Sequence, residues 1–284
     1  MFIPLHDANH LRHIRRQYVT YAIIVINCLI WLFMTAIGAG AGNEVGAQTA
    51  YYSYGFIPAV ANGYQSLPPD LSVLPEYATY ISYAFLHGNF MHLVGNMLFV
   101  WVFGDNVEDA MGHIRFIGFF LACAVAGAWL HALVQPHSPA PLIGASGAAA
   151  GILTAYLMLH PRVAIWVLAL GRIPLRIPAM WIIGAWIAFQ LFSLLVTGDE
   201  KTSWGAHVGG IIAGAILLPL FKRRDVPLFD KNRIDMVVPG SLPPEMQEEE
   251  GRDTTIDAPT PSEPASDNKP PESDRSIPWG RQPR

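Results

Sequence analysis

Four polar residues lie within apolar stretches of the chain, and their types suit hydrolytic chemistry. Ser146 could serve as nucleophile and His207 as general base, because a serine hydroxyl becomes reactive when an imidazole accepts its proton. His92 and Asn96 are four residues apart and would share one helix face. The apolar stretches contain no Asp or Glu, and those that follow the second stretch lie at its cytoplasmic end, on the wrong side, so a Ser–His dyad is predicted rather than a triad.

The elements that must position these residues are predicted to be membrane-spanning helices. Of the 284 residues 52% are hydrophobic and only 14% are charged, against about 25% charged in soluble domains. Each apolar stretch approaches the roughly 20 residues that cross a bilayer. The stretches are residues 21–38, 89–104, 116–134, 145–160, 179–196 and 204–221. The chain is therefore expected to be an all-α integral membrane protein with six spans.

The placement of positive charge predicts the orientation of these spans, because Lys and Arg are retained on the cytoplasmic side. Segments 39–88 and 135–144 contain neither residue, and the loop after the fifth stretch contains only Lys201. The other connections and flanks carry Arg12, Arg15, Arg16, Arg115, Arg162, Arg172, Arg176, Lys222, Arg223 and Arg224. Both termini are therefore expected in the cytoplasm, without a cleaved signal peptide.

Three parts of the chain follow from this pattern. Residues 1–20 are read as a cytoplasmic N-terminal segment and residues 21–221 as a six-helix domain. Residues 222–284 are rich in Pro, Ser, Thr and acidic residues, which predicts a disordered cytoplasmic tail. The basic cluster that opens the tail could contact anionic lipid, although such clusters more often only fix orientation.

Two connections between the spans have compositions of their own. Segment 39–88 is long and rich in tyrosine, which suits an ordered external loop that packs at the membrane interface. Segment 163–170 is apolar but too short to cross a bilayer, so an interfacial turn or strand is expected. Cys28 and Cys123 both lie in apolar stretches and predict burial rather than a disulfide.

The predicted orientation brings the four polar residues to one depth. The second, fourth and sixth spans all enter from the external face, and His92, Asn96, Ser146 and His207 lie near their starts. An ionisable group inside a membrane is a functional candidate by default. Taken singly, however, His92 or Asn96 is more often a hydrogen-bonding contact between helices. Their shared depth favours a common site.

The fourth span is short, at 16 residues or about 24 Å, against a hydrocarbon core of about 30 Å. A recessed start would leave free backbone N–H groups beside Ser146, and such donors stabilise an oxyanion. The dyad also requires close approach of the fourth and sixth spans, for which Gly147, Gly210 and Gly214 are small enough. Alone, the GxxxG spacing of Gly210 and Gly214 commonly means only helix packing.

At these positions the chain resembles the rhomboid family of intramembrane serine proteases. The motifs that carry the resemblance are Gly-Ala-Ser-Gly at 144–147, Ala-His-Val-Gly-Gly at 206–210 with Gly214, His92 followed by Asn96, Phe-Leu-His-Gly at 85–88, and segment 103–112. The resemblance covers the six spans and implies a bacterial-type six-helix fold in the cytoplasmic membrane.

The resemblance also implies roles for individual residues. Ser146 and His207 would form the dyad, while His92, Asn96 and the backbone N–H of Ser146 line the oxyanion hole. Gly144 would let its loop approach the site, and Glu108 would hold the cytoplasmic end of the second span. The fifth span would serve as a lateral gate.

Two positions depart from the family pattern. Many members carry Trp-Arg where alignment on His87 places Ala78 and Thr79. Many also have an aromatic residue four positions after the nucleophile, where this chain has Ala150. Another group must therefore orient His207.

The expected function is hydrolysis of peptide bonds in or near transmembrane segments, with membrane proteins as substrates and membrane lipid as surroundings. The alternatives are a noncatalytic rhomboid-like protein that binds membrane clients, and a transporter. A metal site of His87, His92 and His131 lacks ligand spacing and a carboxylate, so packing or surface roles are expected for His87 and His131. Other intramembrane proteases fit poorly, because His-Glu-x-x-His is absent and Asp105 lacks a second aspartate. No cofactor, metal or nucleic acid is predicted.

Overall fold

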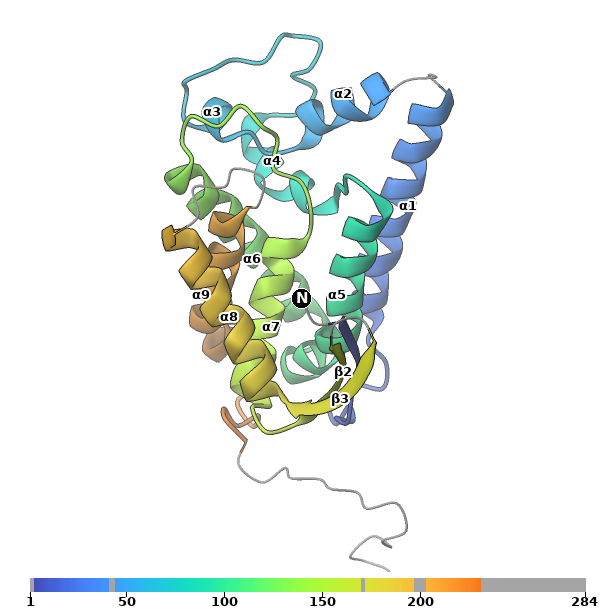
Figure 1. Cartoon of the computed structure of the whole chain (residues 1–284), viewed down its shortest axis with the longest axis vertical. Coiled ribbons are helices and arrows are strands. Elements are labelled where there is room, and N and C mark those ends of the chain that lie inside the picture. The colour runs from blue at the N-terminus through green and yellow to red at the C-terminus, as the bar shows by residue number, and fades with distance from the viewer. Residues whose placement is uncertain (1–2, 41–43, 170–171, 197–202, 231–284) are drawn as a thin grey trace, which may run out of the picture. The chain divides into compact units, whose positions relative to one another are not determined.

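Six helices of the computed structural model coincide with the six apolar stretches (Figure 1). The structure describes residues 3–40, 44–169, 172–196 and 203–230. The six helices are α1 Tyr18–Gly40, α5 Phe90–Met111, α6 His113–Val134, α7 Ser146–Leu159, α8 Ala179–Val196 and α9 Trp204–Phe221. The expected mostly helical membrane bundle is confirmed.

Not all six helices are equally suited to crossing a membrane. Among the described residues four helices are long and apolar enough to do so, namely α1, α6, α8 and α9. Helix α7 is a shorter apolar helix, and α5 ends in a turn that carries Glu108 and Asp109. The count of six spans therefore stays a prediction.

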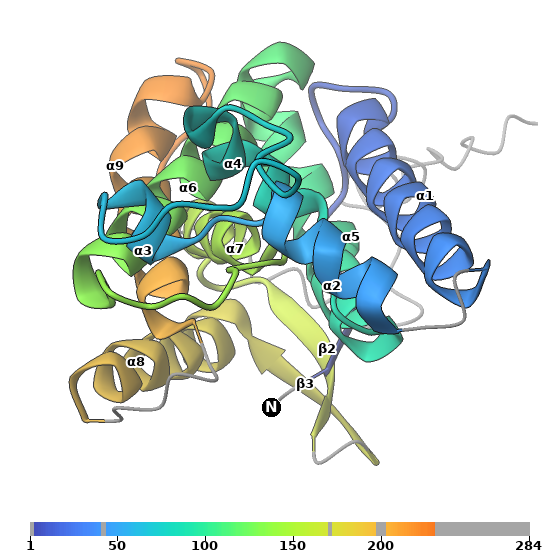
Figure 2. The same cartoon turned by 90° about the horizontal axis from the view of Figure 1, so that it is seen from above.

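Helix α7 lies at the centre of the bundle (Figure 2). It packs against α5, α6, α8 and α9, and most of its side chains are buried. Helix α8 is more peripheral, since 22% of it is buried within the protein, against 44% of α6 and of α9. The end of the bundle at which α7 begins is called the site end, and the end at which α7 stops is called the sheet end.

Small residues set the spacing between α7 and its neighbours. A methyl group added to Gly210 on α9 would run into the carbonyl oxygen of Gly147 on α7. A methyl group on Gly214 would come within 2.5 Å of the carbonyl oxygen of Gly151. Backbone therefore packs directly on backbone along this contact, as the small residues of the two stretches predict.

A three-stranded antiparallel sheet closes the sheet end. Strands β2 Ala164–Ala169 and β3 Ile173–Pro178 form a hairpin, and β1 Ile3–Asp7 pairs with the free edge of β2. Ile165 and Val167 are buried whereas Trp166 between them is exposed, which is the alternation of a strand with one covered face. Of the turn or strand expected within 163–170 a strand is found, while its position at the membrane interface stays a prediction. Its pairing with the N-terminal segment was not predicted.

The long first loop is built of short helices at the site end. They are α2 Glu44–Tyr54, α3 Pro58–Ala61, α4 Glu76–Ser82 and the 3-10 turn η1 Tyr83–Phe85. Phe56 and Leu142 exchange two backbone hydrogen bonds, at 3.1 and 2.7 Å, and so tie this loop to the segment before α7. The order expected of the loop is found in its described residues, while its contact with lipid stays a prediction.

The segment after α9 returns to the bundle before the described chain ends. The N–H of Arg223 donates to the carbonyl of Ala110 at 2.8 Å, and the N–H of Phe229 donates to that of Met158 at 2.7 Å. Residues 231–284 of the expected disordered tail lie outside the described residues. The domain boundary at residue 222 stays a prediction.

Candidate active site

Ser146 is the first residue of α7, and the loop that precedes it contains Gly144. Gly144 has φ +116°, a conformation that L side chains rarely adopt, and its N–H donates to the carbonyl of Tyr83 at 2.9 Å. An added Cβ at Gly144 would lie 2.6 Å from Nε2 of His92. The Ser146 side chain is half-buried, and the first-turn N–H groups beside it have no partner within the helix.

His207 lies in the first turn of α9 and is held by α8. Its Nδ1 is 2.9 Å from Oε1 of Gln190, a residue only 4% exposed. The rings of Trp186 and Trp204 flank it, each with a centroid 6.2 Å from that of the imidazole. These contacts orient His207 without an aromatic residue at position 150. The sequence signal for this contact is an isolated glutamine in the apolar stretch 179–196, for which no role was predicted.

Ser146 and His207 open onto the same cavity of about 740 Å³. It lies between α5, α7, α8 and α9, and His92 and Asn96 also line it. Its walls are mostly apolar and include Met91, Phe99, Leu153, Ile182 and Phe189. No hydrogen bond between the side chains of Ser146 and His207 is found in the described part of the chain. Such bonds commonly tighten only when substrate is bound.

Asn96 is positioned by His87, a histidine for which a packing or surface role was expected. Nδ2 of Asn96 is 2.9 Å from Nε2 of His87, and the His87 ring lies edge-on to that of His92 at 5.1 Å. Burial, with a smaller effect from His92, lowers the pKa of His87 to about 3. With its proton on Nδ1, the neutral His87 ring accepts the Asn96 N–H at Nε2, and Asn96 keeps a second amide proton.

The N-terminus of α5 positions His92, which lies one turn before Asn96. Oδ1 of Asn89 accepts the backbone N–H of His92 at 2.9 Å, which is a side-chain cap on the helix. His92 and Asn96 follow on one face of the first two turns. The structure thus brings together all four polar residues singled out in the sequence, and adds His87 and Gln190 behind them.

The predicted supporting residue Glu108 lies at the sheet end, far along α5 from this cavity. It is fully buried and accepts hydrogen bonds from the N–H of Val19 at 3.0 Å and the N–H of Thr20 at 2.8 Å. The Thr20 hydroxyl donates to it at 2.7 Å, and His113 Nδ1 is a further partner. These contacts join the start of α1 to the end of α5.

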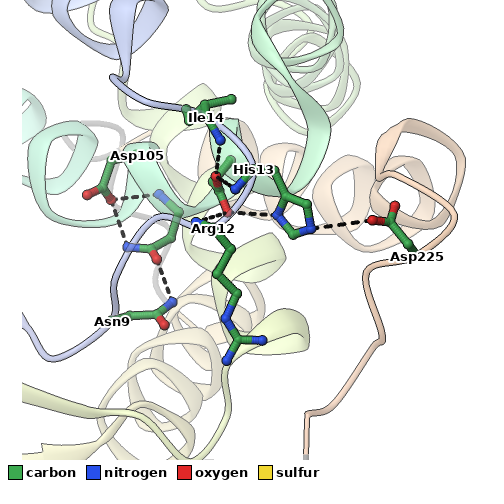
Figure 3. A network of polar contacts seen from close by, with 8 residues as sticks. Asn9, Arg12, His13, Ile14, Asp105 and Asp225 are labelled. Carbon is green, nitrogen blue, oxygen red and sulfur yellow. Dashed lines mark hydrogen bonds and ion pairs between the residues drawn. The ribbon is translucent and has the colours of Figure 1, made fainter.

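Asp109 accepts hydrogen bonds from the segment before α1, of which Figure 3 labels Arg12, His13 and Ile14. It accepts the backbone N–H groups of Arg12, His13 and Ile14 at 3.0, 2.7 and 2.8 Å. His13 Nδ1 lies 3.0 Å from the same carboxylate, and its Nε2 lies 3.4 Å from Asp225. One residue at the end of α5 therefore anchors the N-terminal segment, and His13 extends the contact to the segment after α9.

Asp7 forms the third buried carboxylate contact at this end. It accepts the Tyr156 hydroxyl at 2.6 Å and the Asn106 amide at 3.0 Å, which joins β1 to α7 and α5. Burial raises the pKa of Asp7, and the Tyr156 hydrogen bond opposes that rise.

Among the described residues no group of three His, Cys, Asp or Glu side chains could hold a metal ion. His131 is buried in α6, and its Nδ1 has no hydrogen-bond partner. The expected absence of a metal or cofactor stays a prediction.

A family model and three known proteins that resemble this chain all carry the name rhomboid. Residues 74–224 match the family model described as the Rhomboid domain, so the match includes η1 and five of the six long helices. Rhomboid protein 1, mitochondrial, of Saccharomyces cerevisiae is 31% identical over 147 residues, which are 48% of this chain and 39% of that protein.

Two further relatives come from a plant and a bacterium. RHOMBOID-like protein 12, mitochondrial, of Arabidopsis thaliana is 27% identical over 154 residues, covering 49% of this chain and 44% of that protein. The rhomboid protease GlpG of Klebsiella pneumoniae is 29% identical over 151 residues, covering 52% and 49%. The chain thus spans less than half the length of each relative.

Proposed function

The chain belongs to the rhomboid family, and on that premise we propose that it is an intramembrane serine endopeptidase. Its substrates are membrane proteins, cut in or near a transmembrane segment. One observation carries the proposal: Ser146 at a helix start, His207, His92 and Asn96 all line a single cavity within an apolar bundle.

The reaction would begin with attack by the Ser146 oxygen on a substrate carbonyl carbon. Nε2 of His207 takes the hydroxyl proton, and the tetrahedral intermediate carries its negative charge on the former carbonyl oxygen. The backbone N–H of Ser146 and the side chains of His92 and Asn96 donate to that oxygen. Collapse breaks the C–N bond, and the imidazolium returns its proton to the leaving amine.

The second half restores the enzyme. The substrate's carbonyl carbon is now an ester of Ser146, and water attacks it while His207 takes a proton from that water. The second tetrahedral intermediate breaks the ester bond, the proton returns to the Ser146 oxygen, and the new carboxyl terminus leaves. The half-buried position of Ser146 is compatible with water reaching it from the site end.

The apolar walls of the cavity constrain the substrate. Phe99, Leu153 and Trp186 suit apolar side chains of a membrane segment. An intact helix hides its carbonyl groups in internal hydrogen bonds, so a substrate must unwind locally before attack. Substrates are therefore expected to carry small or helix-breaking residues near the cut.

The test is cleavage of a transmembrane reporter by the full chain in liposomes, followed by sequencing of the new terminus. Ser146→Ala should abolish cleavage and labelling by a fluorophosphonate, whereas Ser66→Ala, an exposed serine in the first loop, should change neither. Turnover by folded Ser146→Ala equal to that of the original chain would contradict the assignment of Ser146 as nucleophile. A folded chain that neither cuts nor labels would instead favour the noncatalytic client-binding role.

The chain is an integral membrane protein of this family, and its relatives include mitochondrial proteins and a bacterial protease. We propose the bacterial cytoplasmic membrane as its location, with the site end outside and both termini in the cytoplasm, on the basis of the Lys and Arg placement. A cysteine replacing Ser66 should then react with a membrane-impermeant maleimide in intact cells. A cysteine replacing Asp225 should react only after the membrane is opened.

A further inference from the structure

Gln190 is a polar residue in the apolar helix α8. Its neighbours on α8, Leu191 and Phe192, are 42% and 60% exposed, and so present apolar surface outward. Gln190 itself is turned inward and is 4% exposed. An amide inside an apolar membrane helix costs free energy unless a partner satisfies it. Its observed partner is Nδ1 of His207, at 2.9 Å.

The same face of α8 makes a second contact with this histidine. Trp186 precedes Gln190 by four residues, which places the two side chains one above the other. The Trp186 ring lies 6.2 Å from the imidazole at an interplanar angle of 39°, while Trp204 stands nearly perpendicular at 88°. A helix other than those carrying the dyad therefore holds the general base.

The chemistry of the amide determines what this contact does. A glutamine side-chain oxygen can only accept a hydrogen bond, so Nδ1 must carry the proton that lies between them. In a neutral imidazole the other nitrogen, Nε2, then has a free lone pair. That lone pair is what a general base must offer to a serine hydroxyl.

We propose that Gln190 is a positioning residue that fixes His207 in the base-competent tautomer, with its proton on Nδ1 and Nε2 free for Ser146. The inference rests on the proposed function and deepens it. When Nε2 takes the Ser146 proton, the Nδ1–H bond to Gln190 persists, so the imidazolium keeps its orientation until the proton passes to the leaving amine. Gln190 thus occupies the place that a carboxylate fills in a triad.

The decisive variant is Gln190→Leu, which keeps bulk but cannot accept a hydrogen bond. Loss of one orienting hydrogen bond should lower kcat about tenfold or more with KM within about twofold, because Gln190 lines the cavity but is only 4% exposed and its Oε1 contacts His207. The fluorophosphonate labelling rate of Ser146 should fall in parallel. Asn27→Leu is the matched control, since it removes a buried amide from α1 whose bond goes only to its own helix, at Ile23.

Gln190→Glu separates positioning from a merely structural role. Its acceptor oxygen should restore most of kcat. An ionised carboxylate would also favour the imidazolium and move the acidic limb of the kcat/KM profile to higher pH. His92 on α5 and His131 on α6 are the other titratable groups that face His207, so the profile is compared between variants in which both are retained.

The outcomes separate this inference from the proposed function. An inactive original chain would count against the proposed function. An active chain in which folded Gln190→Leu keeps its kcat, labelling rate and pH profile would overturn the role of Gln190 alone. Should Gln190→Leu lose its unfolding transition, Gln190→Glu decides: low kcat in a folded protein, or an acidic limb that does not move, would overturn the inference.

Discussion

The two ends of the bundle are built differently. At the sheet end Glu108, Asp109 and Asp7 are buried carboxylates with several donors each, and the cavity among the neighbouring residues is only about 100 Å³. At the site end a cavity of about 740 Å³ is lined mostly by apolar side chains with a few polar groups. The contrast indicates that one end is cross-linked for stability while the other is left open for a ligand, and the two can be altered separately.

The largest expected effect comes from the contact that spans both ends, between α7 and α9. Gly210→Leu places a side chain where the Gly147 carbonyl lies, so the helices must separate and both stability and cleavage should be lost. Gly184→Leu on α8 is the control, because an added Cβ there meets nothing within 4 Å. Thermal unfolding and reporter cleavage measure the pair, and a folded, active Gly210→Leu would contradict the packing described.

The second effect should be confined to the sheet end. Glu108→Ala leaves the N–H groups of Val19 and Thr20 buried without an acceptor, at about 1–3 kcal/mol for each. The unfolding temperature should fall by about 2–4 °C per kcal/mol, while cleavage per folded molecule is retained. Exposed Glu76→Ala should change neither. A large loss of kcat without loss of stability in Glu108→Ala would show that the two ends are not separable.

The third effect should be confined to the site end. Gly144→Ala combines a strained φ with a Cβ placed against His92, so kcat should fall by about tenfold for each 1.4 kcal/mol that the displaced His92 adds to the barrier. The strain of about 1–3 kcal/mol should also lower the unfolding temperature, as it should in a variant with strain alone. Gly63→Ala is the control for strain alone, since its φ is +73° and nothing lies within 4 Å. Equal kcat values for the two variants would remove the argument for contact with His92.

The smallest effect concerns pH at the sheet end. Because burial raises the pKa of Asp7 in the folded protein, its contribution to stability is full below its ordinary pKa of 3.8 and is lost as pH rises through the folded value. Asp7→Asn keeps an acceptor for Tyr156 and should flatten that decline. Unfolding temperatures from pH 4 upward test this, and an unchanged slope in Asp7→Asn would assign the decline to other groups.

The helices could be predicted from the sequence because apolar length alone specifies them in a membrane. The ends of the helices were harder to predict. Helix α5 continues to Met111, beyond the predicted Gly104, because the carboxylates of its last turns accept hydrogen bonds from a segment some ninety residues earlier. Strand β1 was missed for the same reason, since Ile3–Asp7 becomes a strand only against β2.

The candidate site divides in the same way. Ser146, His207, His92 and Asn96 could be grouped from the sequence because topology alone sets their depth. Gln190 and His87 could not, because their importance lies in which atom each side chain faces, and that depends on how α8 and the first loop pack. The catalytic roles of the first four and the positioning roles of Gln190 and His87 stay predictions.

Helix α8 takes part in two features of the site. It forms one wall of the cavity through Ile182 and Phe189, and it contacts His207 through Gln190 and Trp186. A sideways displacement of α8 that widened the cavity would therefore also release the imidazole. If the proposed function holds, widening of the cavity on the α8 side and orientation of the proposed base His207 exclude one another.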